Sequence, residues 1–284
     1  MIYSVDTTAT ELYVERTGAG PAVVLVPGGG GDAAMYQDLV PVLARQFTVI
    51  TYDRRGNSRS HWKNGQQDVG LDEQAADVVA ILDHAGLDRA FVFGSSSGAA
   101  ITVTLLTSYA ERLAGAVVHE LPAIRVLPDA DLQQAFFDEV ARITEREGAL
   151  PAMLRFAATT MDKPPRMLEH RLGRSVGTAA IKLANRVTPK SNEMRRLFGN
   201  ADLLMRSEVP SFVRWQPDLD ALRNVGVRWA FAVGVESVGR YYSRPARQLS
   251  AELGVPCLEF PGGHLGYQRH AEEFGRRLGE FLHG

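Results

Sequence analysis

The chain of 284 residues contains one cysteine, Cys257, and no long apolar segment. A single cysteine cannot form an internal disulfide, so nothing in the sequence indicates an oxidising compartment. The N-terminal stretch MIYSVDTTATELYVERTG carries acidic and polar residues where a signal peptide needs an apolar run. No segment approaches the roughly eighteen uninterrupted apolar residues of a membrane-spanning helix. We therefore expect a soluble, cytoplasmic protein without a membrane partner.

An excess of charge of one sign is also missing. Lysine and arginine total 31 against 33 aspartate and glutamate, for a formal net charge of −2. Nucleic-acid-binding proteins usually show a strong basic excess, so no nucleic-acid partner is expected. The 7 histidines are scattered, and none stands near cysteine, aspartate or another histidine at the spacing of metal ligands. No metal site is expected either.

The sequence does contain a regular alternation of strand-like and helix-like segments. Continuous apolar runs, typical of strands buried on both faces of a parallel sheet, alternate with segments of helical spacing. The runs predict strands at 22–26, 46–52, 89–94, 113–122, 227–234 and 255–260, after an early antiparallel strand at 11–18. Helices are predicted around Met35–Leu43 and at 72–86, 97–109, 245–253 and 271–282. This alternation predicts an α/β fold with a doubly wound, mostly parallel sheet.

A long segment without strand signals interrupts this alternation. Residues 122–216 show helical spacing but no convincing buried strand, and so predict an inserted helical unit, or cap. The predicted division is therefore a first part of the core at 1–121, the insertion at 122–216 and a second part of the core at 217–284. Residues 155–214 contain twelve Lys or Arg against five Asp or Glu. This local basic excess indicates either a solvated helical surface or a field that attracts an anionic substrate.

The stretch FVFGSSSGAA, residues 91–100, joins a predicted buried strand to a predicted helix. A nucleophilic serine has to stand clear of the backbone at a tight strand-to-helix turn. Gly94 and Gly98, two residues on either side of Ser96, let neighbouring chain segments approach such a turn. Ser97 opens the helix, so its backbone N–H points toward an oxyanion formed beside Ser96. Ser96 is the predicted nucleophile and Ser97 a predicted oxyanion donor.

With this turn in place, the sequence resembles the α/β-hydrolase superfamily over nearly the whole chain. The matching segments are LVPGGGGD, TYDRRGNSRS, VFGSSSGAA, AVVHELP, RWAFAVGVES and LEFPGGHLGY. The resemblance implies a second oxyanion N–H from the loop after the first of these strands, at Gly29 with Gly30 as the alternative. It implies that the catalytic base is His264, in the glycine-rich turn after the last strand. It also implies a mainly structural role for Asp53 and Arg54.

The base needs a carboxylate that holds its tautomer and stabilises its positive charge. Most of the family carries an Asp three residues after a Gly at the end of the penultimate strand. Here that position is Ser237, and Glu236 is one residue early. One subgroup of haloalkane dehalogenases and the lactonase that opens zearalenone place a Glu after the strand that follows the nucleophile helix. Glu120, in VVHELP, matches that position and would face the same crevice.

The resemblance thus favours Glu120 as the acid and keeps Glu236 as the alternative. A structural role for Glu120 is the other interpretation, as a cap of the next helix or a partner of Arg125. Serine at the turn, in place of the Asp of dehalogenases and epoxide hydrolases, favours attack on an acyl carbonyl and an acyl-enzyme.

We predict a carboxylic ester hydrolase that acts on a small-molecule ester or lactone and requires no metal or organic cofactor. Two other interpretations stay open. One is a non-hydrolytic member of the family, such as a cofactor-free cyclase or lyase, and the other is a silent ligand-binding module. The sequence leaves the substrate, and the choice between a monomer and a homodimer, undecided.

Overall fold

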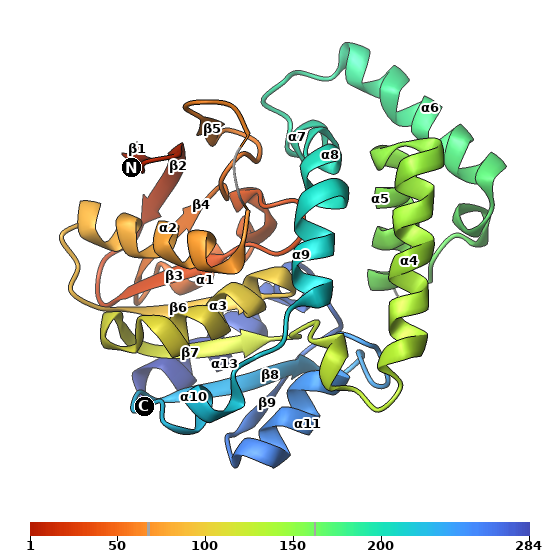
Figure 1. The fold of residues 1–284 in the computed structure, drawn as a ribbon. Coiled ribbons are helices and arrows are strands. Elements are labelled where there is room, and N and C mark those ends of the chain that lie inside the picture. Colours follow the sequence, from red (N-terminus) through yellow and green to blue (C-terminus); the bar gives the residue numbers. More distant parts are fainter. Residues whose placement is uncertain (67–68, 162) are drawn as a thin grey trace.

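The computed structural model describes residues 1–66, 69–161 and 163–284. A single sheet runs through the molecule in the order β1-β2-β4-β3-β6-β7-β8-β9, with β5 paired to β2 (Figure 1). The strands are β1 Ile2–Asp6, β2 Thr10–Thr17, β3 Ala22–Val26, β4 Thr48–Tyr52, β5 His61–Trp62, β6 Ala90–Ser95, β7 Leu113–His119, β8 Trp229–Gly234 and β9 Cys257–Phe260. Strands β4, β3, β6, β7, β8 and β9 pair in parallel, and β1, β2 and β5 pair antiparallel. The predicted fold class is confirmed.

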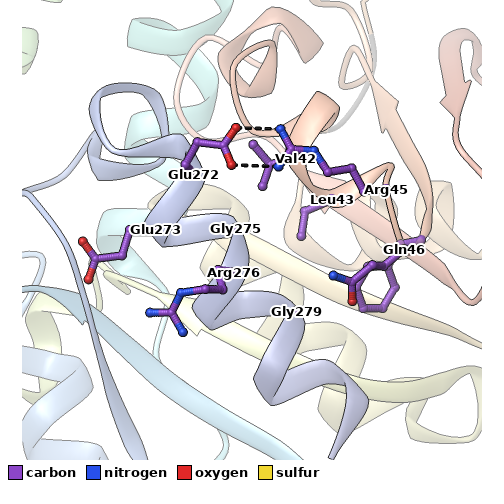
Figure 2. A pocket seen from close by; sticks show the side chains of 10 residues that line it. Val42, Leu43, Arg45, Gln46, Glu272, Glu273, Gly275, Arg276 and Gly279 are labelled. Carbon is purple, nitrogen blue, oxygen red and sulfur yellow. Dashed lines mark hydrogen bonds and ion pairs between the residues drawn. The ribbon is translucent and has the colours of Figure 1, made fainter.

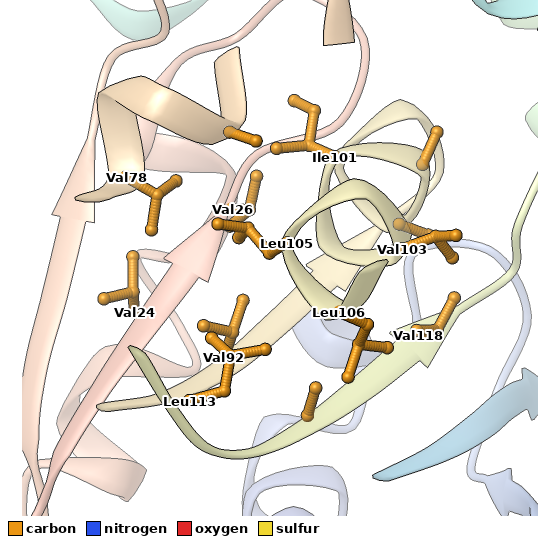
Figure 3. Close-up of a cluster of buried hydrophobic side chains, with 14 of the residues drawn as sticks. Val24, Val26, Val78, Val92, Ile101, Val103, Leu105, Leu106, Leu113 and Val118 are labelled. Atoms are coloured by element: carbon orange, nitrogen blue, oxygen red, sulfur yellow. The ribbon is translucent and has the colours of Figure 1, made fainter. Parts of the chain in front are cut away.

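Side chains along each central strand alternate between the two faces of the sheet, and a different set of helices covers each face. Val24 of β3 belongs to the cluster that packs on α2 (Leu71–His84) and α3 (Ser97–Ser108). Its neighbour Leu25 belongs to the cluster on α1 (Val40–Leu43) and α13 (Ala271–His283), because successive strand side chains point to opposite faces. Figure 3 shows the first cluster, where side chains of α3 meet those of β3 and β6. Burial on both faces explains the continuous apolar runs in the sequence.

The other core helices are α10 Leu219–Arg223, α11 Arg244–Leu253 and α12 Gly266–Arg269. The predicted helices after residue 70 and the predicted strands end within two residues of their observed limits, except for the strand predicted at 113–122, which ends at His119. The single helix predicted around Met35–Leu43 is wrong, because that segment forms a 3-10 turn at Ala33–Tyr36 and then α1. Pro41 lacks a backbone N–H and fits the first turn of a helix, so a separate helix starts there. The short strands β1 and β5 were not predicted; β1 buries one side chain, that of Val5.

Between β7 and α10 the described residues form helices and no strand. These elements are η3 Ile124–Val126, α4 Ala130–Glu147, α5 Ala149–Ala157, η4 Ala158–Thr160, η5 Arg166–Glu169, α6 Arg171–Val187, α7 Glu193–Gly199, α8 Ala201–Leu203, the π-helical turn η6 Leu204–Glu208, and α9 Val209–Arg214. They lie on the side toward which the arrows of β7 and β8 point (Figure 1). We refer to residues 122–216 as the helical insertion; its limits as a domain stay a prediction. Among the described helices, none combines the length and apolar character that a membrane span requires.

Candidate active site

Ser96 stands at the turn between β6 and α3. Its backbone has φ 58° and ψ −126°, a conformation that is rare for a residue with a side chain. Its N–H donates to the carbonyl of His119 (3.0 Å), and its carbonyl accepts from the N–H of Ala99 (2.8 Å). The Ser96 side chain is partly exposed, whereas Ser95 and Ser97 are buried. Of the three consecutive serines, Ser96 is the one that a substrate can reach from solvent.

The two glycines that flank the turn are required by close contacts between backbones. A Cβ on Gly98 would lie 2.3 Å from the carbonyl oxygen of Val26, and a Cβ on Gly94 would lie 2.2 Å from the carbonyl oxygen of Gly98. Side chains at these positions would push α3 away from β3 and β6, so the turn depends on both glycines.

The loop after β3 passes beside Ser96. A Cβ on Gly28 would lie 3.1 Å from the Cβ of Ser96, and Gly30 has φ 86°, which favours glycine. Within the described part of the chain, the N–H groups of Gly29, Gly30 and Ser97 donate to no protein acceptor. The loop therefore offers free donors at Gly29 and Gly30, and α3 offers a further one at Ser97.

Glu120 follows β7 and lies fully buried, with φ 51°. One carboxylate oxygen, Oε2, is 2.6 Å from Nδ1 of His264, and the other, Oε1, accepts from the N–H of Gly234 (2.8 Å). His264 lies in the turn between β9 and α12 and is 6% exposed. The structure thus brings Glu120 and His264 together, and both oxygens of the carboxylate have a partner.

The protonation state of Glu120 fixes the tautomer of His264. Burial acts to raise the pKa of Glu120, but the hydrogen bond with His264 and the other polar neighbours lower the pKa to about 2. An ionised carboxylate accepts hydrogen bonds and donates none, so the proton of the shared bond sits on Nδ1 of His264. Nε2 of His264 is then free to accept a proton from a substrate or a nucleophile.

Glu236, the alternative acid, is exposed and makes no hydrogen bond through its carboxylate within the described residues. Its backbone N–H donates to the carbonyl of Gly262 (3.0 Å). Ser237, at the position where most of the family carries Asp, is 1% exposed. The structure therefore brings Glu120, and not Glu236, to His264. Among the described contacts there is no bond between Ser96 Oγ and Nε2 of His264; such bonds are often long in a free enzyme and tighten with substrate.

The helical insertion holds the outer side of the loop after β3. The side-chain amide of Asn200 donates to the carbonyl of Gly30 (2.6 Å), and its oxygen accepts from the N–H of Ser58 (2.8 Å). Arg196 makes two hydrogen bonds to Asp32, of 2.7 and 3.0 Å. Residues of the insertion thus bind the segment that carries the predicted oxyanion donors.

A buried ion pair holds the inner side of the same loop. Arg54 donates to the carbonyl of Gly28 (2.9 Å) and to Oε2 of Glu208 (2.6 Å). Glu208 belongs to the π-helical turn, and its Oε1 accepts from Asn57 (2.9 Å). The side chains of Arg54 and Glu208 are 1% and 2% exposed, so each needs the other to compensate its charge. Arg54 has structural contacts, as the sequence indicated.

Several side chains near the site were not singled out by the sequence. Ser95 Oγ and Nδ1 of His119 share a hydrogen bond of 2.8 Å directly behind the nucleophile turn. The ring of Tyr242 lies 4.2 Å from that of His264, centroid to centroid. The sequence signal that could have pointed to His119 is its position directly before Glu120. The structure adds that β6 and β7 place His119 opposite Ser95.

The basic residues of the insertion are in part neutralised. Arg155, Arg174, Arg196 and Arg206 each form an ion pair with a carboxylate. Attraction of an anionic substrate by this region stays a prediction.

A hollow of about 310 Å³ lies apart from these residues, between α1 and α13 (Figure 2). Arg45 and Glu272 form an ion pair across it with a shortest distance of 2.6 Å. Ser96, Glu120 and His264 do not line this hollow. We assign the hollow no catalytic role.

The sequence matches a known protein family. The model of the alpha/beta hydrolase fold matches residues 21–198, more than half of the chain. The chain belongs to the α/β-hydrolase family. An uncharacterized hydrolase, YraK of Bacillus subtilis (strain 168), is 28% identical over 95% of this chain and 92% of its own length.

Two further proteins are similar in part or in fold. A zearalenone hydrolase of Bionectria ochroleuca is 41% identical over 113 residues, which cover 39% of this chain and 43% of that protein. The crystal structure of the enol-lactonase from Burkholderia xenovorans LB400 superposes with a TM-score of 0.70 at 18% identity, covering 100% of both chains. At that identity the superposition shows the shared fold of the α/β-hydrolases.

Proposed function

We propose that this α/β-hydrolase cleaves a carboxylic ester or lactone through an acyl-enzyme on Ser96. The observation that carries the proposal is the 2.6 Å bond between Nδ1 of His264 and the buried carboxylate of Glu120. A carboxylate in that position holds the neutral ring of His264 in the tautomer with its proton on Nδ1, so that Nε2 is the acceptor, and it stabilises the imidazolium that forms when Nε2 takes a proton.

The reaction begins when Oγ of Ser96 attacks the acyl carbonyl carbon and transfers its proton to Nε2 of His264. The N–H of Ser97 and that of Gly29, or Gly30, bind the resulting oxyanion. The C–O bond to the leaving alkoxide then breaks, and the alkoxide takes the proton from Nε2. Water, deprotonated by the same nitrogen, attacks the acyl-enzyme and releases the carboxylic acid and Ser96. With a lactone, acid and alcohol remain in one product molecule.

The helical insertion acts as a cap over this site. A Cβ built on Gly29 would contact Leu204 at 3.5 Å and Phe156 at 3.9 Å, so apolar side chains of the insertion lie against the oxyanion loop. Phe137, Met205 and Phe212 belong to the same apolar cluster. These contacts support a substrate with an apolar acyl or alkyl part. The names of the zearalenone hydrolase and the enol-lactonase agree with ester-type substrates.

Stoichiometric labelling by a serine-reactive alkyl phosphonate tests the nucleophile directly. We expect one adduct per chain, located at Ser96 by peptide mass spectrometry, and none in Ser96→Ala. Ser97→Ala is the matched control, because its backbone N–H remains and the Ser97 Oγ has no hydrogen-bond partner within the described residues. Absence of labelling in the unmodified protein, or equal labelling of Ser96→Ala, would overturn the proposal.

A further inference from the structure

Helix α6 of the insertion turns its apolar side chains away from the protein. Leu172, Val176, Leu183 and Val187 are 77%, 53%, 63% and 86% exposed. The intervals of four, seven and four residues between them place all four on one face of the helix. Ala179, also exposed, completes this face. Figure 1 shows α6 on the outer side of the insertion, beyond α5.

The inner face of α6 is mostly small or polar, with the half-buried Ile181 as its one large apolar side chain, whereas an ordinary surface helix turns most of its large apolar side chains inward. The buried residues of α6 are Gly173, Arg174 and Thr178. A Cβ on Gly173 would lie 2.0 Å from the carbonyl oxygen of Met167, and Arg174 forms an ion pair with Glu147 (2.6 Å). The helix is therefore held largely by close backbone contact and charge, while its four outward apolar side chains belong to no apolar cluster of the described residues. A contiguous exposed apolar face of this kind marks an interaction surface.

We propose that this face, Leu172–Val176–Ala179–Leu183–Val187, binds the same face of a second copy of the chain in an antiparallel helix pair. The pattern is symmetric about the bond between residues 179 and 180. When two copies pair antiparallel about that point, Leu172 meets Val187 of the second copy and Val176 meets Leu183. An isologous twofold interface requires this reciprocity of contacts.

The centre of the pair carries small side chains. Ala179 meets Ala180 of the second copy, and Ala180 is likewise exposed. Small residues at the crossing point allow two helices to approach closely, so the larger residues on either side can interdigitate.

Charge on α6 is compatible with self-pairing. The helix carries Arg171, Arg174, Lys182 and Arg186 and no acidic residue. Arg174 is buried against Glu147, and in the antiparallel register Arg171, Lys182 and Arg186 stand level with Thr188, Gly177 and Gly173, so no basic residue faces another directly. A basic helix could also bind an anionic membrane surface, but the apolar face lacks the Trp or Phe residues typical of such helices. The reciprocal pattern favours a second copy.

The expected association is weak. One pair of helices buries less than the roughly 1,200 Å² typical of stable specific interfaces, so we expect dissociation in the micromolar range or weaker. Sedimentation velocity over a series of concentrations should therefore show a rise from the 31.1 kDa monomer toward twice that mass.

Charge substitution in the face tests the register. Val176→Lys and Leu183→Glu should each abolish the dimer, because each places a charge against an apolar residue of the second copy. The double variant Val176→Lys/Leu183→Glu should restore it, because the introduced lysine of each copy then faces the introduced glutamate of the other. Both positions are exposed, so all variants should keep the wild-type thermal midpoint at monomeric concentration.

Four results would overturn the proposal. A wild-type chain that stays monomeric at every concentration shows that the face does not self-associate. Single variants that still dimerise, or a double variant that stays monomeric, show that another surface or register is used. Sedimentation with vesicles containing anionic lipid, by the wild type but not by Leu183→Glu, assigns the face to a membrane instead.

Discussion

Glu120 and Ser96 both have positive φ, at 51° and 58°, although neither is a glycine. Such conformations cost about 1–3 kcal/mol each and persist where the surroundings hold them. The N–H of Ser96 is bound by the carbonyl of His119, and the N–H of Glu120 by that of Ala232. The two strained residues follow β6 and β7 at the same edge of the sheet. The fold thus gives up stability to aim the predicted nucleophile and the predicted acid into one crevice.

His119, the last residue of β7 and the hydrogen-bond partner of Ser95, makes the free energy of unfolding depend on pH. Burial lowers the pKa of His119 to about 4 from an ordinary value of 6.5, although the charge of Glu120 opposes this. Below pH 6.5 the unfolded chain takes up a proton that the folded chain takes up only near pH 4. Stability is therefore lost as the pH falls through this window, by about 2 kcal/mol between pH 7 and pH 5.

We predict that His119→Asn removes most of this difference, because asparagine keeps a polar partner for Ser95 and does not titrate. Urea denaturation at pH 7 and at pH 5 measures the difference in unfolding free energy between the two pH values. His170→Asn, at an exposed position, should retain the wild-type difference. If His119→Asn loses as much stability as the wild type between these pH values, His119 is not its source.

Among the elements of the fold, the π-helical turn and the helices before it hold the loop that carries the predicted oxyanion donors Gly29 and Gly30. We predict that Asn200→Ala lowers kcat about tenfold or more and leaves KM nearly unchanged. Its amide binds the carbonyl of Gly30, and a loop that drifts loses oxyanion stabilisation that exists only in the transition state.

The matched control is Glu147→Gln, which breaks the ion pair with Arg174 inside the insertion without touching the loop. It should keep the wild-type kcat. Steady-state kinetics on one ester compares the two variants. Equal losses of kcat in both would mean that Asn200 acts through the general stability of the insertion.

Sequence patterns predicted the local elements well and the long-range contacts poorly. Ser96, Gly94 and Gly98 were predictable because the turn that they form is local. The Arg54–Glu208 pair joins residues 154 positions apart, and no periodicity indicates it. Helical spacing likewise reveals the apolar face of α6 but not that this face points outward, because the direction depends on what the helix packs against. The pairing of Glu120 with His264 came from family resemblance.

At the scale of the whole molecule, core and insertion are coupled by the buried Arg54–Glu208 pair. In the full chain, Arg54→Leu leaves the charge of Glu208 buried and unpaired, and we predict a loss of about 3–5 kcal/mol of unfolding free energy. In a chain with residues 128–212 replaced by a short linker, Glu208 is gone, and Arg54 loses its ion pair but keeps its hydrogen bonds to Gln74 and to the carbonyl of Gly28. The same substitution should then cost little or stabilise the protein.

Denaturation of the four proteins, full and spliced, each with and without Arg54→Leu, measures this coupling. Equal destabilisation in both backgrounds would show that Arg54 stabilises the core independently of the insertion.

Glu120, rather than Glu236, is predicted to support His264 during turnover. Turnover of one ester by Glu120→Gln and Glu236→Gln tests it most directly, because both substitutions preserve shape and remove one charge. We predict that Glu120→Gln loses about ten-thousand-fold in kcat, as serine proteases do when the equivalent acid becomes an amide. Glu236→Gln should stay close to wild type, since its carboxylate is exposed and makes no hydrogen bond within the described residues. A nearly inactive Glu236→Gln together with an active Glu120→Gln would contradict the account.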